Sequence, residues 1–419
     1  MNSNKSFIFR HIFLLILLTL TAHSHSQQIS AIDLDALLHL TYTLTDVKPG
    51  DYFSTWNFTS PENMCTSFNG VTCSIINNEL RVTSLFLGTG LSDSPGLAGT
   101  ISDSIYNLTE LTQLILYPGI VTGFIPQEIG SKCNKLRVLS LTNNRLTGSI
   151  PESLSGLLNL HTLDLSHNRL TGPIPPSLQK MKVMVLAFNR LAGKIPDFSS
   201  ESEVMHLDLR NNMFSGTLPE NMPLSVRYLS LSGNGLWGPV NSIRSENLVY
   251  LDLSMNKFSG PVPVGFFKGS LSSMYLQRNN FSGEILLPST SAGFEPYGPG
   301  SIVDLSHNYL SGDIPNFLDS VETLFLNNNH FTGKVPQSYV ENVFAGTTRT
   351  LYLQHNYITD FPLENRREFV LPDGVALCLS YNCMVPPPVG LTACPLSAGG
   401  PVSRPFRQCS VFQSGNSMG

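Results

Sequence analysis

The sequence predicts an α/β solenoid: a right-handed superhelix of repeats with a concave parallel β-sheet and disulfide-stapled caps. One phrase, with the template L-x-x-L-x-L-x-x-N-x-L-x-G-x-I-P, recurs along most of the chain. Within this phrase the leucines alternate as they do in a short strand with one buried face. Six of the seven cysteines lie towards the two ends of the repeat array, where the stack of repeats has to be closed.

The length of 419 residues does not require several globular domains, because repeat proteins grow by adding units. The net charge of −5 argues against a nucleic acid or an anionic membrane as the partner. We expect four segments along the chain. They are a signal peptide (1–26), an N-terminal cap (27–81), about twelve repeats (82–362), and a C-terminal cysteine-containing cap with a flexible tail (363–419).

Residues 1–26 have the features of a secretory signal peptide. Lys5 and Arg10 supply a basic front, an apolar run from Ile12 to Leu20 follows, and small residues come after it. The run is shorter than the roughly 20 residues that span a bilayer, so we expect cleavage rather than a membrane anchor. The C-terminus is polar and lacks a lipid-anchor signal. The sequence therefore predicts a secreted protein of the extracellular space or cell wall, with no membrane span of its own.

The cysteines form an N-terminal pair, a single Cys133 and a C-terminal group. An oxidising compartment predicts a bridge between Cys65 and Cys73. The C-terminal group consists of Cys378, Cys383, Cys394 and Cys409. These four are expected to form two more bridges, and all three connectivities stay open. Cys133 is interpreted as a buried free thiol, and no C-x-x-C pair indicates a metal site.

The asparagine of the template recurs ten times, at intervals of 21 to 29 residues. Its positions are Asn144, Asn168, Asn189, Asn212, Asn234, Asn256, Asn279, Asn308, Asn329 and Asn356, and Gly119 takes the same place once earlier. Each side-chain amide is expected to satisfy backbone groups where the chain turns out of the strand. Since one repeat cannot bury its leucines alone, the neighbouring repeats supply the stability.

The clearest copies, LRVLSLTNNRLTGSIP (136–151) and LHTLDLSHNRLTGPIP (160–175), resemble the repeats of plant extracellular leucine-rich-repeat proteins. That family includes receptor-kinase ectodomains, receptor-like proteins and polygalacturonase-inhibiting proteins. The segment that ends in the phrase GVTC is similar to the family's N-terminal capping module. The resemblance covers almost the whole mature chain and implies a solenoid that binds another molecule. The chain departs from the pattern in residues 286–300, which lengthen one repeat, and in Asp360, which replaces the template glycine.

Three sequons predict N-glycosylation at Asn57, Asn107 and Asn280. Asn280 directly follows a template asparagine, so a glycan there is expected to restrict one rim of the binding face.

Catalytic patterns do not converge on an active site. The last five residues match G-x-S-x-G, but that motif needs a strand before it and a helix after it. Acidic and histidine residues recur at equivalent positions of different repeats, as Asp164, Asp208, Asp252, Asp304, His167 and His307. We interpret them as a row of solvated or turn-supporting residues. The sequence therefore predicts a protein that is not an enzyme and has no cofactor.

The candidate ligand-binding site is formed by outward positions of the concave strands, where larger side chains occur from His206 onwards. These residues are His206, Arg210, Tyr228, Tyr250, Tyr275, Gln277, Arg278, Phe325, Asn327, Tyr352 and Gln354. Tyr and Arg are favoured at binding hot spots, although strands also favour aromatic residues for packing alone. The column formed by Arg145, Arg169 and Arg190 is interpreted as a solvated row.

The predicted function is recognition of an extracellular protein or peptide, in a receptor-like or adaptor role in signalling or defence. A membrane receptor-kinase ectodomain is a candidate partner. The alternative is an inhibitor of pathogen polygalacturonase-type enzymes, and a structural role in wall assembly is a third reading. An inhibitor would favour about ten repeats and a strongly charged concave face, whereas this array is longer and its face is aromatic and polar.

Overall fold

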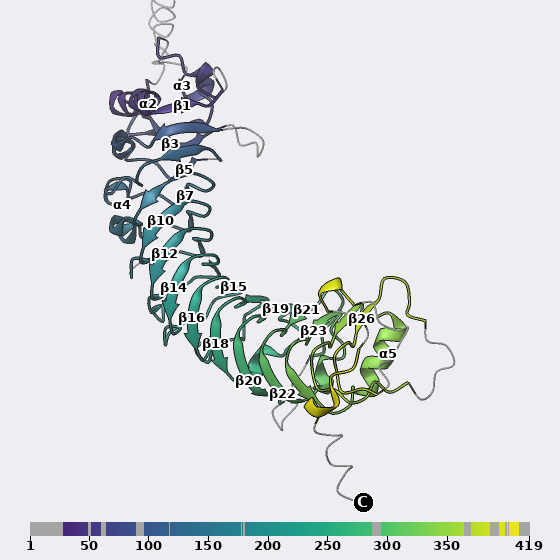
Figure 1. The fold of residues 1–419 in the computed structure, drawn as a ribbon. Coiled ribbons are helices and arrows are strands. Elements are labelled where there is room, and N and C mark those ends of the chain that lie inside the picture. Colours follow the sequence, from purple (N-terminus) through teal and green to yellow (C-terminus); the bar gives the residue numbers. More distant parts are fainter. Residues whose placement is uncertain are drawn as a thin grey trace, which may run out of the picture.

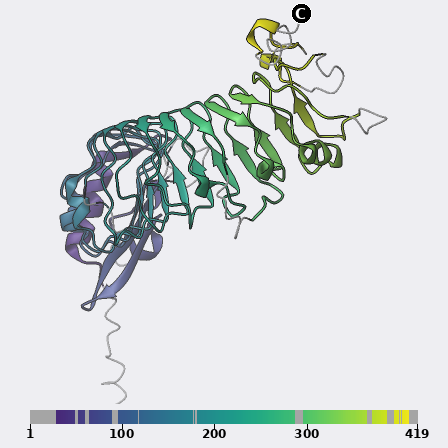
Figure 2. The ribbon, with the colours of Figure 1, turned by 90° about the horizontal axis from the view of Figure 1, so that it is seen from below.

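The computed structural model describes residues 28–48, 52–59, 64–88, 96–116, 118–176, 178, 181–286, 295–363, 370–385, 394–398, 400 and 402–409. The expected signal peptide, the last ten residues and residues 287–294 of the segment that lengthens one repeat lie outside the described residues. The described part forms an elongated, curved stack of strands (Figure 1). Helix α2 and the C-terminal 3-10 helices lie at opposite ends of this stack (Figure 2).

The inner side of the curve is a fourteen-stranded sheet, parallel except for its first pair (Figure 1). In spatial order its strands are β2 (Val71–Ile76), β3 (Glu79–Leu87), β5 (Gln113–Leu116), β7 (Val138–Ser140), β9 (Thr162–Asp164), β11 (Val183–Val185), β13 (His206–Asp208), β15 (Tyr228–Ser230), β17 (Tyr250–Asp252), β19 (Ser273–Tyr275), β21 (Ile302–Asp304), β23 (Thr323–Phe325), β25 (Thr350–Tyr352) and β26 (Ala376–Cys378). Equivalent repeat positions pair without a register shift, as in Leu163, Met184 and Leu207.

Two further sheets lie on the outer side. A nine-stranded parallel sheet contains β8 (Thr147–Gly148), β10 (Arg169–Gly172), β12 (Arg190–Gly193), β14 (Met213–Gly216), β16 (Gly235–Gly238), β18 (Lys257–Gly260), β20 (Asn280–Glu284), β22 (Tyr309–Asp313) and β24 (His330–Thr332). A small sheet contains β1 (Leu44–Asp46), β4 (Leu97–Thr100) and β6 (Ile120–Thr122).

Short helices complete the described elements. The α-helices are α2 (Ala31–Thr43), α3 (Met64–Ser67), α4 (Ile129–Lys132) and α5 (Gln337–Ala345). The 3-10 helices are η1 (Phe53–Thr55), η3 (Asp103–Asn107), η4 (Glu152–Gly156), η5 (Val264–Phe266), η6 (Asn316–Leu318), η7 (Leu396–Ala398) and η8 (Phe406–Gln408). None of the helices in the described ranges is both long enough and apolar enough to cross a bilayer.

The core is a continuous column between the inner and outer sheets. Each repeat contributes its two strand leucines, such as Leu163 and Leu165, and the leucine after the asparagine, such as Leu170, all fully buried. Burial of a leucine contributes about 1.5–3 kcal/mol, but only because the next repeat covers it. The predicted solenoid with a concave parallel sheet is therefore confirmed.

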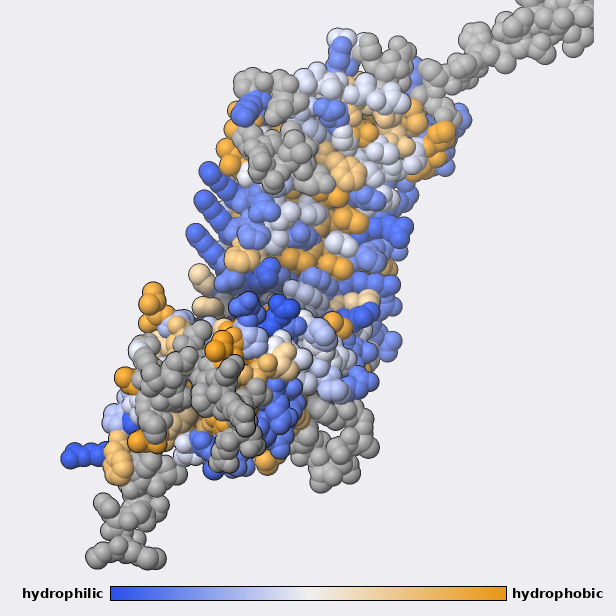
Figure 3. All heavy atoms as spheres, turned by 90° about the vertical axis from the view of Figure 1, so that its right-hand side faces the viewer, coloured by the Kyte–Doolittle hydropathy of each residue, from blue (hydrophilic) through white to orange (hydrophobic). Residues whose placement is uncertain are grey.

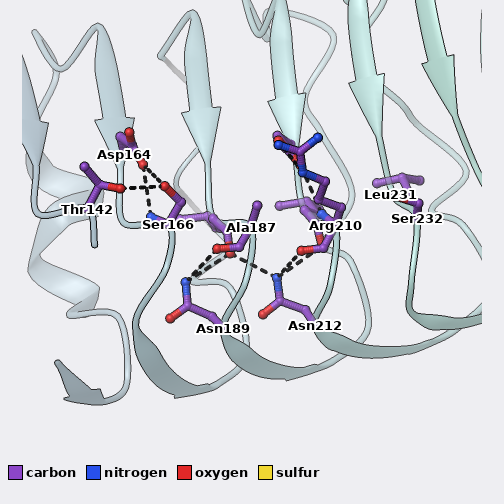
Figure 4. Close-up of polar contacts among 12 residues, drawn as sticks. Thr142, Asp164, Ser166, Ala187, Asn189, Arg210, Asn212, Leu231 and Ser232 are labelled. Carbon is purple, nitrogen blue, oxygen red and sulfur yellow. Dashed lines mark hydrogen bonds and ion pairs between the residues drawn. The ribbon is translucent and has the colours of Figure 1, made fainter. Parts of the chain in front are cut away.

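The predicted asparagine ladder joins the repeats through the backbone. The Asn189 and Asn212 amides both donate to the carbonyl oxygen of Leu186, at 3.1 and 3.0 Å (Figure 4). The Asn212 Oδ1 atom in turn accepts a hydrogen bond from the backbone N–H of Leu191 at 3.0 Å. Gly119 replaces asparagine in an early repeat because a Cβ atom there would lie 2.6 Å from the carbonyl oxygen of Leu97.

The ladder also continues beyond the expected end of the repeats at residue 362. Strand β26 adds to β25 in parallel, and Asn382 accepts a hydrogen bond from the N–H of Ile358 at 3.1 Å. The Asn382 amide donates to the carbonyl oxygens of Leu353 and Leu379. The phrase L-C-L-S-Y-N contains the template spacing, so the signal for this further turn is present in the sequence.

Disulfides close both ends of the stack. Cys65 is bonded to Cys73, as predicted. At the other end the open choice is resolved as Cys378–Cys394 and Cys383–Cys409. Cys133 is a buried free thiol, as predicted, and burial raises its pKa to about 12.

Non-reducing proteolysis followed by mass spectrometry is expected to yield linked peptides joining Cys378 to Cys394 and Cys383 to Cys409. The reason is that the folded cap brings these two pairs together, with Cα–Cα distances of 4.7 and 5.8 Å. The reduced and alkylated sample is the control, in which both linked species disappear. A link between Cys378 and Cys383 would contradict the prediction.

Candidate ligand-binding face

Three rows of side chains cover the concave face, because the strand leucines point into the core and their neighbours point away from it. The first row precedes the first strand leucine, the second lies between the two leucines, and the third follows the second leucine. Seen from the side that faces right in Figure 1, the surface carries hydrophobic residues in short stretches among hydrophilic ones (Figure 3). Pockets among the described residues lie elsewhere, for example one lined by Tyr297, Glu322 and Arg349.

Four predicted site residues form a continuous set of aromatic rings on adjacent strands, which we call the central aromatic row. His206, Tyr228 and Tyr250 belong to the first row, and Tyr275 belongs to the second. The His206 and Tyr228 rings stack with centroids 4.3 Å apart, and the Tyr228 and Tyr250 rings stack at 4.1 Å. The Tyr275 ring lies 5.8 Å from the Tyr250 ring and is tilted by 48°. The structure thus brings these residues together over four neighbouring strands.

Burial favours the neutral forms of Tyr250 and His206 in this row. Burial and the nearby Asp252 carboxylate raise the pKa of Tyr250, so its hydroxyl stays protonated. Burial lowers the pKa of His206 despite the nearby Asp208 carboxylate. The row therefore offers ring edges and neutral polar groups rather than charge.

The four aspartates lie in the second row, one on every second strand from β9 to β21. Asp164 accepts hydrogen bonds from the backbone N–H and the hydroxyl of Ser166, and Asp252 does the same for Ser254 (Figure 4 shows the first pair). Their expected turn-supporting role is therefore confirmed. Asp208 is turn-supporting rather than solvated: it accepts a hydrogen bond from the backbone N–H of Arg210, only 3% of it is exposed, and burial raises its pKa.

Arg210 is held by its own chain. Its backbone N–H donates to Asp208 Oδ1 at 3.1 Å, and its Nε atom lies 3.4 Å from Asp208 Oδ2. The guanidinium also lies over the Phe188 ring, 5.5 Å from its centroid. Arg278 is exposed and occupies a left-handed turn with φ of 57°, just before the ladder asparagine.

The remaining predicted residues form a second group nearer the C-terminal end. The Phe325 and Tyr352 rings meet edge to face at 5.2 Å, and Asp304 on strand β21 separates them from Tyr275. Asn327 and Gln354 belong to the third row, where they are only 7% and 4% exposed. The prediction that these two side chains are exposed to a ligand is therefore wrong. They pack against neighbouring side chains where the strands end.

Beyond this second group, a disulfide-linked segment, which we call the wall, lies at the last strand of the concave face. Cys378 occupies the second row of the last strand and is bonded there to Cys394. The Ser380 hydroxyl lies 3.2 Å from the Cys394 sulfur. Sequence reasoning could not find this wall, because the pairing of the four C-terminal cysteines was open.

The three sequon asparagines Asn57, Asn107 and Asn280 are all exposed. The Thr59 hydroxyl donates to Asn57 Oδ1 at 2.7 Å. Asn280 begins β20 on the outer sheet, so its side chain is not part of the concave rows. The arginine column of Arg145, Arg169 and Arg190 is exposed, as expected of a solvated row. In the described residues, His, Cys, Asp and Glu form no group of three that could hold a metal ion.

Comparisons with known proteins agree with this architecture. Sequence profiles of the leucine-rich repeat match residues 109–170, 203–223 and 247–268, and the profile of the leucine-rich-repeat N-terminal domain matches residues 30–74. The chain is 34% identical to Receptor-like protein 35 of Arabidopsis thaliana over 70% of its own length and 31% of that protein. It is 31% identical to Receptor-like protein kinase BRI1-like 3 of Arabidopsis thaliana, over 78% of the chain and 27% of that protein. The chain thus spans about a third of the length of these curated relatives.

Solved structures show the same fold. The structure of PEPR1–AtPEP1 superposes with a TM-score of 0.65 at 30% identity, over 84% of this chain and 52% of that chain. The plant peptide hormone receptor RGFR1 in complex with RGF2 has a TM-score of 0.57 at 29% identity, over 68% and 46%. A plant ice-binding protein has a TM-score of 0.57 at 25% identity and is 98% covered. The chain belongs to the leucine-rich-repeat proteins related to plant receptor-like proteins and receptor-kinase ectodomains.

Proposed function

We propose that this protein is a non-catalytic recognition protein that binds an extracellular protein or peptide on its concave face. The observation that carries the proposal is the central aromatic row, in which four rings run without interruption across strands β13 to β19. Rigid aromatic side chains bury a large area at little conformational cost, which is why they dominate binding hot spots.

The shape of the face favours an extended ligand over a small molecule. Neighbouring parallel strands lie about 4.8 Å apart, so the central aromatic row extends for about 15 Å along the stack. A small molecule would instead need a concave pocket that encloses most of its surface. One of the similar solved structures is described as a plant peptide hormone receptor in complex with RGF2, which is consistent with this reading.

A receptor-like or adaptor role in signalling or defence is the finer part of the proposal. A receptor-kinase ectodomain is the class of partner that we expect for such a role. Inhibition of a pathogen polygalacturonase-type enzyme is the alternative, and the same experiment decides between them.

The double variant Tyr228→Ala/Tyr250→Ala is expected to lose the native partner. The two stacked rings form the centre of the proposed contact, so recovery of the partner should fall about tenfold or more. Tagged protein would be captured from its native extracellular fluid and its partners quantified by mass spectrometry. Thermal unfolding would confirm that the variant is folded.

The matched control is Tyr42→Ala/Tyr309→Ala, which removes two exposed tyrosines that lie on α2 and on the outer strand β22. Capture of a membrane ectodomain or a peptide by the wild type and the control, but not by the variant, supports recognition. Capture of a pectin-degrading enzyme transfers the function to inhibition. Equal recovery with all three proteins places the binding site elsewhere.

A further inference from the structure

The strand register brings two carboxylates to either side of Tyr275. Asp252 on β17 pairs with Tyr275 on β19, which pairs in turn with Asp304 on β21. All three occupy the second row and therefore point to the same concave side. With strands about 4.8 Å apart, a group above Tyr275 is close to both acidic side chains. Burial and these two carboxylates raise the pKa of the Tyr275 hydroxyl.

The Tyr275 ring is placed differently from the others of the central aromatic row. Tyr228 and Tyr250 stack within 4° of parallel, so each covers a face of the other. Tyr275 is tilted by 48° from Tyr250 and lies further away, so the Tyr250 ring does not stack on the face of the Tyr275 ring. An uncovered ring face attracts a cation through the negative charge of its π-system.

Within the described residues no cation forms an ion pair with either carboxylate, although burial, which raises the pKa of Asp304, is opposed by Ser306 and by the charge of Arg278. Among the ion pairs of the described residues, Arg210 takes Asp208, whereas none involves Asp252 or Asp304. One oxygen of each of these two carboxylates accepts from the turn at the end of its strand, through Ser254 and Ser306. The second oxygen of each remains for another donor.

Buried polar atoms beside these carboxylates also lack partners. Ser230 lies next to Asp252 in the second row, is fully buried, and its hydroxyl makes no hydrogen bond. The Gln277 Oε1 atom, on the segment that follows Tyr275, is buried and accepts no hydrogen bond. A buried polar atom without a partner costs about 1–3 kcal/mol, so a ligand group that reached these atoms would gain part of that free energy. Most of these groups, the second carboxylate oxygens and Gln277 Oε1, can only accept hydrogen bonds. A matching ligand would therefore be rich in hydrogen-bond donors.

We propose that Asp252, Tyr275 and Asp304 form a subsite for a cationic side chain, arginine or lysine, of a polypeptide ligand. The proposal rests on the proposed function, because it names the chemistry that the same face recognises. Arginine and lysine carry only hydrogen-bond donors, and each can lie over the Tyr275 ring while donating to a flanking carboxylate.

The test uses fluorescein-labelled hexa-arginine as the probe, with fluorescence anisotropy at physiological ionic strength. The variant Asp252→Asn/Asp304→Asn keeps the shape of both side chains and removes both charges. It is expected to weaken binding of the probe about tenfold or more, because charge-assisted hydrogen bonds are about twice as strong as neutral ones. The control Glu152→Gln/Glu203→Gln removes two exposed carboxylates outside the concave sheet and changes the net charge equally. It should change binding by less than about twofold.

Tyr275 provides a second readout that general charge attraction would not move. Tyr275→Phe keeps the ring and is expected to bind the probe nearly as well as the wild type. Tyr275→Ala removes the ring and should weaken binding about fivefold, as the loss of a cation–π contact of about 1 kcal/mol predicts. Labelled hexa-glutamate should not bind any of these proteins.

Equal weakening by the Asn pair and the Gln pair would mean that only net charge matters, which overturns the subsite. Equal binding by Tyr275→Ala and the wild type would overturn it as well. If a native partner is lost on Tyr228→Ala/Tyr250→Ala but Asp252→Asn/Asp304→Asn binds hexa-arginine as well as the wild type does, the proposed function stands and the subsite fails. If no native partner is lost on Tyr228→Ala/Tyr250→Ala, but hexa-arginine binding is weakened by Asp252→Asn/Asp304→Asn and by Tyr275→Ala, the proposed function fails and the cation subsite stands.

Discussion

Replacing Asn256 by alanine is expected to lower the free energy of unfolding by about 3 to 5 kcal/mol. Asn256 is 8% exposed, and its Oδ1 atom accepts from the N–H of Leu236 at 3.1 Å. Its amide donates to the carbonyl oxygens of Leu231 and Leu253 at 2.9 and 3.2 Å. Alanine cannot replace any of these contacts, so backbone groups of two neighbouring repeats would remain buried without partners. Urea denaturation followed by circular dichroism measures the change.

The control is Asn247→Ala. Asn247 is exposed and makes one described hydrogen bond, to the carbonyl oxygen of Leu224 at 3.0 Å. Its replacement should cost less than about 1 kcal/mol. Similar losses for the two variants would show that the ladder contributes no more than an exposed hydrogen bond. The wild-type sequence itself has one ladder position without asparagine. Gly119 occupies it, where the neighbouring backbone leaves no room for a side chain.

Replacing Asp33 by alanine is expected to destabilise the N-terminal cap by about 3 to 5 kcal/mol. Asp33 is fully buried, and its carboxylate accepts from Arg81 Nε and Nη2 at 3.0 and 2.9 Å. It also accepts from the backbone N–H of Val82 at 2.7 Å. Without Asp33 this N–H would lose its partner, and the Arg81 guanidinium would lose the carboxylate and keep the Thr109 hydroxyl at 3.1 Å. Helix α2 would then lose its main polar connection to strand β3.

Hydrogen–deuterium exchange can locate this effect, because repeats depend mainly on their nearest neighbours. Amides of α2 and β3 should exchange faster in the Asp33→Ala variant, while those of β15 and β17 should not change. Asp35→Ala is the control on the same helix. The Asp35 side chain is 59% exposed, and its described ion pair is the exposed one with His39 at 3.7 Å. If the central strands lost protection as much as α2 did, the cap would not be a separate unit of stability.

The sequence by itself determined the solenoid, its strands and its ladder. Each of these depends on residues that recur at one spacing, and periodic residues occupy equivalent places once the repeats stack. The ten ladder asparagines, the buried strand leucines and the exposed arginine column are therefore where the template places them. The same reasoning brought His206, Tyr228, Tyr250 and Tyr275 to one face, because they share outward positions on consecutive strands.

Only the tertiary structure decided how those side chains lie against one another. The template predicts that Asn327 and Gln354 face outwards, but not that neighbouring repeats bury them. The pairing of Cys378 with Cys394 depends on how the last segment folds back over β26, which no local pattern specifies. Likewise, the placement of Asp252 and Asp304 beside Tyr275 follows from the register between strands. Spacing along the chain fixes what recurs, whereas burial and contact depend on distances across the stack, and these exist only after the repeats have packed.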